Sequence, residues 1–136
     1  MTSSEKASAL HEEGYNCAQC TLCSLSAFTG TDDGTAKALA GCLGHGVGAG
    51  EICGAVTGAA LALGLAFPCT EGRGFSRDRA KRLGEELCSR FKSEFGALRC
   101  EELLNMTFPE RKCSEYIDRC RALAEELIEN ERRSSL

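Results

Sequence analysis

The uncharged segment from 52 to 70 constrains the fold of this chain more than any other part of it. It runs for 19 residues without a charged side chain, contains Gly54, Gly58 and Gly64, and ends just after Pro68. Its length approaches what a helix needs to cross a bilayer. The glycines, the proline and the charged flanks instead favour a buried central helix, which amphipathic helices from the rest of the chain would cover.

The remaining chain has the composition and periodicity of such covering helices, because Ala, Leu, Glu, Lys and Arg lose little rotamer freedom in a helix. Apolar residues recur at spacings of three and four along 76–95: Ala80, Leu83, Leu87, Phe91 and Phe95. We expect further helices at 5–13 (capped by Ser3 or Ser4), 17–28 (capped by Asn16, closed by Gly30), 35–43 and 113–131, with a turn at 100–104. The sequence predicts an all-α fold, a compact bundle of about five to six helices around the central Gly- and Ala-rich helix, in one domain spanning residues 1–136 and without strands.

The charge balance restricts the classes of partner. Lys and Arg number 16 against 20 Asp and Glu, so the net charge is −4. A nucleic-acid binder needs a basic stripe or patch, and none is present. We therefore expect no nucleic-acid partner. Because we interpret 52–70 as a buried helix, we also expect no membrane span.

Ten cysteines are the outlying feature of the composition: Cys17, Cys20, Cys23, Cys42, Cys53, Cys69, Cys88, Cys100, Cys113 and Cys120. The first residues lack the basic start and apolar core of a signal peptide, which predicts a cytoplasmic location. In a reducing compartment many cysteines indicate metal binding or redox chemistry rather than a framework of disulfides.

The spacing of Cys17, Cys20 and Cys23 is that of the first part of a bacterial ferredoxin run. The match stops there, because the fourth cysteine and its proline are missing. A regular helix would also spread the three thiols over about 120° of its surface. We interpret Cys20 and Cys23 mainly as small buried apolar side chains, and paired zinc knuckles are absent.

Cys53 follows a glycine run and opens the central helix. Unsatisfied N–H groups and the helix dipole would stabilise a thiolate there and lower its pKa, partly offset by Glu51. The run matches neither a P-loop nor a dinucleotide fingerprint, and Gly54 with Gly58 has the spacing of close helix packing. His45 within the run is either structural or a base or ligand.

Four segments together resemble the C-GCAxxG-C-C family of redox-active proteins: G-Y-N-C-A-Q at 14–19, G-E-I-C-G-A-V-T-G-A at 50–59, F-G-x3-C-x-E-L-L at 95–104 and C-x2-Y-I-x-R-C at 113–120. The resemblance implies that Cys17, Cys53, Cys100 and Cys113 form one four-cysteine site. Cys20, Cys42 and His45 are additions to the family pattern, and they are secondary candidates that could enlarge the site or simply pack. The resemblance also implies a relation to the C-terminal part of split-Soret cytochromes, hence electron transfer and a homodimer. The chain has no C-x2-C-H motif, so we expect no c-type haem.

Three functions remain open on these residues. The first is a cytoplasmic redox protein with an unidentified redox partner, which uses an iron-sulfur cluster on the four cysteines or a dithiol in which Cys53 attacks and Cys17 is its partner. The second is a non-catalytic module that binds zinc, copper or iron through thiolates. The third is a helical interaction domain whose cysteines are buried for packing alone.

Overall fold

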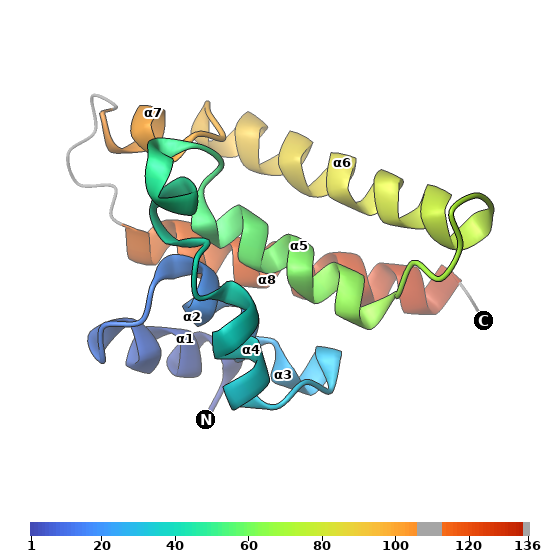
Figure 1. Ribbon diagram of the computed structural model, residues 1–136, viewed down its shortest axis with the longest axis horizontal. Helices are drawn as coiled ribbons and strands as arrows, with labels where there is room; N and C mark the ends of the chain where they lie inside the picture. The colour runs from blue at the N-terminus through green and yellow to red at the C-terminus, as the bar shows by residue number, and fades with distance from the viewer. Residues whose placement is uncertain (106–112, 135–136) are drawn as a thin grey trace.

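The computed structural model describes residues 1–105 and 113–134, and every regular element within these ranges is helical, which confirms the all-α class (Figure 1). An isolated backbone bridge joins Ile52 and Arg99. The helices are α1 (Ser3–Glu12), α2 (Cys17–Ser24), α3 (Ser26–Thr29), α4 (Asp33–Ala40), the π-type turn η1 (Gly46–Gly50), α5 (Gly54–Ala66), α6 (Phe75–Phe95), α7 (Cys100–Leu104) and α8 (Cys113–Ser134).

The uncharged helix α5 occupies the centre, as its sequence predicts. It packs against α2, α8 and α6 (Figure 1), and the residues buried in its first two turns are Gly54, Ala55, Val56, Gly58 and Ala59. Within the described ranges, no helix combines the length and the apolar character that crossing a membrane requires.

Helix α5 is shorter than the 52–70 expected for it. Its start is delayed because the N–H of Cys53 donates to the carbonyl of Leu98 (2.8 Å), which draws the preceding backbone into an extended pairing. Its end comes early because Pro68 disfavours helical angles at the residue before it, and Phe67 has left the helical region (φ −132°, ψ 76°).

Two glycines let α5 approach α2 closely. A Cβ added to Gly58 would lie 2.7 Å from the carbonyl oxygen of Ala18, and one added to Gly54 would overlap the sulfur of Cys17. Because no larger side chain fits in these places, the Gly54-x3-Gly58 spacing has the packing function that the sequence predicts.

Side-chain caps set the starts of the N-terminal helices and correct two expected boundaries. Thr2 rather than Ser3 or Ser4 caps α1, in a reciprocal capping box with Glu5. Asp32 accepts a hydrogen bond from the N–H of Thr35 (3.2 Å), so α4 begins at Asp33, earlier than expected.

Candidate functional site

The four cysteines expected to form one site all lie at the beginnings of helices. Cys17 is the first residue of α2, Cys53 is the N-cap of α5, Cys100 is the first residue of α7, and Cys113 is the first residue described in α8. The positive end of a helix dipole favours negative charge at such a position. The sequence predicts helix starts at Cys17, Cys53 and Cys113, whereas the short helix that begins at Cys100 was expected only as a turn.

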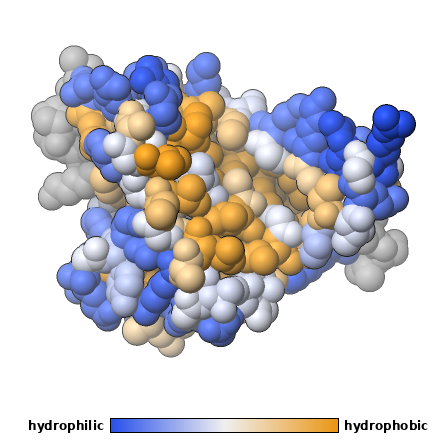
Figure 2. All heavy atoms as spheres, viewed as in Figure 1, coloured by the Kyte–Doolittle hydropathy of each residue, from blue (hydrophilic) through white to orange (hydrophobic). Residues whose placement is uncertain are grey.

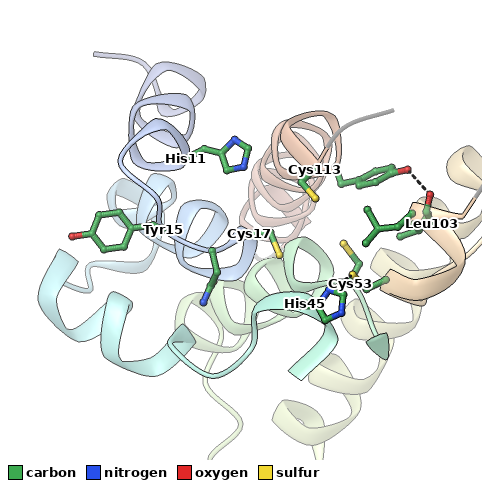
Figure 3. A pocket seen from close by; sticks show the side chains of 11 residues that line it. His11, Tyr15, Cys17, His45, Cys53, Leu103 and Cys113 are labelled. Carbon is green, nitrogen blue, oxygen red and sulfur yellow. Dashed lines mark hydrogen bonds between the residues drawn. The ribbon is translucent and has the colours of Figure 1, made fainter. Parts of the chain in front are cut away.

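These four side chains line a single pocket of about 230 Å³ at one end of the bundle (Figure 3). The described residues around it are His11, Tyr15, Asn16, Cys17, His45, Cys53, Cys100, Leu103, Leu104, Cys113 and Tyr116. Four distant parts of the sequence therefore bring their thiols to one cavity. All four are free thiols in the structure.

Cys17 is positioned by the residues that surround it in the N-C-A-Q motif. The Asn16 side chain accepts from the N–H of Gln19 (2.8 Å), while Gln19 accepts from the N–H of Asn16 (3.1 Å). The same two amides also donate to carbonyls at the end of α4, from Lys37 to Gly41. This capping box fixes the first turn of α2, and the missing side chain at Gly54 leaves room for the Cys17 sulfur.

Cys53 and Cys100 are brought together by the bridge between Ile52 and Arg99. The N–H of Cys53 donates to the carbonyl of Leu98 (2.8 Å), and the N–H of Cys100 donates to the carbonyl of Glu51 (2.6 Å). Residues alternate between the two faces of an extended pair, so Cys53 and Cys100 lie diagonally on the same face. The short antiparallel contact therefore aims both thiols at the pocket.

Cys113 is held by its helix and by the tyrosine one turn later. The buried hydroxyl of Tyr116 donates to the carbonyl of Leu103 in α7 (3.4 Å, Figure 3), and its ring packs edge-on against Phe91 and Phe95 of α6. Cys113 and Tyr116 are three residues apart and share one face of α8. The thiol is thus anchored relative to α7, which carries Cys100.

His45 reaches the pocket from a glycine loop with unusual backbone angles. His45, Gly46, Val47 and Gly48 have φ values of 52°, 58°, 60° and 70°. A left-handed conformation is uncommon for a non-glycine residue and exceptional for a β-branched one. It turns the imidazole toward the cysteines, with Nδ1 3.5 Å from the sulfur of Cys100 (Figure 3).

His11 also lines the pocket, from α1, and sequence reasoning missed it. It lies on an exposed position of an ordinary amphipathic helix. No spacing relates it to a cysteine motif, so the sequence carries no signal for its location.

The expected lowering of the Cys53 pKa is wrong for the metal-free protein. Burial raises the pKa of Cys53 to about 12; hydrogen bonds from the N–H groups of Ala55 and Val56 lower it, and the neighbouring Cys17 and Cys100 raise it further. Burial likewise raises the pKa of Cys100 and of Cys113, in each case with a further contribution from Cys17. Loss of water at the thiol outweighs the helix dipole because the side chain is nearly inaccessible to solvent.

The secondary candidates separate by location. Cys20 and Cys23 are fully buried in the apolar core, which agrees with their interpretation as packing residues. Cys42 is exposed, and neither it nor Cys20 lines the pocket. His45 alone of the three secondary candidates joins the four cysteines there.

The chemistry of the donors suits a soft metal or an iron-sulfur cluster, since thiolates and imidazole bind both. Among residues 1–105 and 113–134, no three His, Cys, Asp or Glu side chains already stand in an arrangement that could hold a single ion. The cavity between the thiols has room for several atoms. The residues present therefore fit a polyatomic group by donor type and by space.

Comparison with protein families matches residues 15–129 to the family described as "Putative redox-active protein (C_GCAxxG_C_C)". This range includes all four pocket cysteines and most of the chain. Neither a curated protein nor a solved structure shows a significant match.

Proposed function

Because the chain belongs to the C_GCAxxG_C_C family of redox-active proteins, we propose that it transfers electrons through an iron-sulfur cluster held by Cys17, Cys53, Cys100 and Cys113. The observation that carries this proposal is the arrangement of these four thiols around one cavity, each at the start of a helix. A bound cluster would supply one-electron oxidation and reduction, with its potential set by charge, hydrogen bonds and solvent exposure.

The helix starts support an anionic centre. Four thiolates carry more negative charge than most clusters can neutralise, and burying uncompensated charge is costly. The positive ends of the helix dipoles lie beside the sulfurs, and the N–H groups of Ala55 and Val56 donate to the sulfur of Cys53. The helix starts thus contribute compensating charge, and none of the described residues that line the pocket is a lysine or arginine.

The protonation of the metal-free thiols favours the cluster over the dithiol alternative. An attacking thiol works best when its pKa is near the ambient pH, whereas the pKa of Cys53 is raised to about 12. A buried thiol with such a pKa is almost entirely protonated at neutral pH and is a poor nucleophile. Metal binding removes this obstacle, because ligation displaces the thiol proton.

Anaerobic purification with elemental analysis tests the proposal. We expect iron and acid-labile sulfide in the wild-type protein and in Cys42→Ala, the control that removes an exposed thiol outside the pocket. We expect both to be lost in Cys53→Ala. Zinc or copper alone would support a metal-binding module instead. Absence of metal with a reversible change in thiol count would support a disulfide, and absence of both would refute redox chemistry at this site.

A second copy of the chain is the partner that the surface supports. An apolar face along α4 and α5 includes Leu39, which is 48% exposed, together with Leu43, Leu61 and Leu65 (Figure 2). A helix that is apolar on every side is normally covered, and an isologous contact would cover this face on both chains at once. We therefore propose a homodimer, in the reducing cytoplasm that keeps the thiols free to bind a cluster.

A further inference from the structure

We propose that His45 is a metal ligand of this centre, bound through Nδ1 to the same metal atom as Cys100. The inference rests on the proposed four-thiol centre and extends its donor set to an imidazole. Of the two histidines among the described residues that line the pocket, His45 is the one whose ring lies beside a sulfur, with Nδ1 3.5 Å from the Sγ atom of Cys100.

The distance between the two atoms agrees with shared coordination. In a tetrahedral site with metal–sulfur bonds of about 2.3 Å and metal–nitrogen bonds of about 2.0–2.1 Å, the two ligand atoms stand about 3.5 Å apart. The Nδ1 and Sγ atoms already have this separation without a metal. Placing a metal atom between them therefore requires little change in their spacing.

The backbone that positions the imidazole of His45 has unfavourable conformations. His45 is left-handed (φ 52°), and so is the following Val47 (φ 60°), although neither residue favours that region. Gly46 between them packs so tightly on the backbone of Glu51 that a Cβ would overlap it. The loop is thereby tied to Glu51, whose carbonyl also binds the N–H of Cys100. One backbone segment thus sets the positions of both proposed ligands.

The donor set has a chemical consequence. Replacing thiolate by imidazole on an iron raises the reduction potential of a [2Fe–2S] centre. His45 would therefore set the electron affinity of the site, whereas the remaining cysteines would hold the group in place. With His45 as a ligand the pocket offers five donors, whereas a [2Fe–2S] cluster takes four terminal ligands, so one of the four thiols would remain unbound.

His45→Gly is the variant best suited to the test, because glycine adopts φ 52° without strain and removes only the imidazole. His11→Ala is the matched control, since it removes the other histidine that lines the pocket. Circular dichroism verifies that both variants fold. The proteins are reconstituted with iron and sulfide without oxygen, reduced, and studied by pulsed electron paramagnetic resonance.

We expect a strong 14N coupling in the wild-type protein and in His11→Ala, its loss in His45→Gly, and its return when imidazole is added. The same coupling in His45→Gly as in wild type would overturn the inference while leaving the proposed cluster intact. If no cluster assembles in the wild-type protein, binding of Co2+ to the reduced protein tests instead whether His45 is a metal ligand. If Co2+ affinity falls by about tenfold or more in His45→Gly but not in His11→Ala, His45 is supported as a metal ligand even though the cluster proposal has failed. Equal affinity in His45→Gly and wild type, or no Co2+ binding in wild type, would refute the role of His45 as a ligand.

Discussion

Substituting Gly54 by alanine tests the link between helix packing and the site. A Cβ at this position would overlap the Cys17 sulfur and lie 3.1 Å from the carbonyl oxygen of Leu43 and 3.2 Å from the N–H nitrogen of Ala18. Two of these three atoms belong to the backbone, so they cannot yield by a rotamer change. Either α2 moves away from α5, or the Cys17 sulfur leaves its position.

The expected magnitude follows from two opposing effects. Forcing an extra methyl group into a packed core costs about 1–3 kcal/mol, while replacing glycine by alanine in a helix contributes up to about 1 kcal/mol. We predict that the unfolding free energy of the metal-free protein falls by about 1–2 kcal/mol. For a domain of this size, that lowers Tm by roughly 3–12 °C.

Two glycine variants separate packing from the site. Gly84→Ala in α6 adds a Cβ with no atom within 4 Å, so its Tm should stay unchanged or rise. Gly58→Ala strains the same contact between α2 and α5 through Ala18, but it does not displace the Cys17 sulfur directly. Thermal unfolding and iron content of all three variants are compared. If the Gly54→Ala variant is as stable as Gly84→Ala and keeps its iron, then the missing side chain at Gly54 is not needed for helix packing or for the position of the Cys17 sulfur.

Three further predictions concern the rest of the molecule. Arg82→Met should lower the unfolding free energy by about 1–2 kcal/mol, because Arg82 makes two 2.8 Å hydrogen bonds to the mostly buried carboxylate of Glu131 and is itself half-exposed. Lys81→Met, which removes an exposed ion pair at 4.0 Å, should have little effect in the same urea titration. Burial raises the pKa of Cys20 from about 9 to about 12, so the unfolded chain ionises first and the unfolding free energy of the metal-free protein should fall between about pH 9 and 12. Cys20→Ala should make this decline shallower, and an unchanged slope would count against the buried thiol as its cause. Leu39→Glu should convert the proposed dimer to a monomer in light scattering, whereas Phe75→Ser, at an exposed phenylalanine outside that face, should not.

Much of the fold could be predicted from local patterns. The uncharged stretch indicated a central helix, and the spacing of Leu83, Leu87 and Phe91 indicated the buried face of α6; all three side chains are buried. Helix ends were harder to place. The start of α5 depends on a hydrogen bond to Leu98, 45 residues away along the chain, and no local propensity reports such a partner.

The sequence predicted that four particular cysteines lie together, but it predicted neither their environment nor every residue that lines the pocket. Family resemblance selected Cys17, Cys53, Cys100 and Cys113, and the fold gathers all four around one cavity. The pKa of Cys53 could not be predicted, because helix position is read from the sequence whereas burial depends on which other elements cover the thiol. His11 could not be found either, since its proximity to the pocket arises only from how α1 packs.

The sequence by itself determined the all-α class, the central place of α5 and the need for small residues at Gly54 and Gly58, because charge, periodicity and side-chain size are local properties. Only the tertiary structure decided that the beginnings of α2, α5, α7 and α8 meet at one pocket and that His45 stands beside Cys100. That convergence depends on packing directions and on one short backbone pairing between distant segments. Such contacts arise from the whole chain's burial of apolar surface, so no single stretch of residues encodes them.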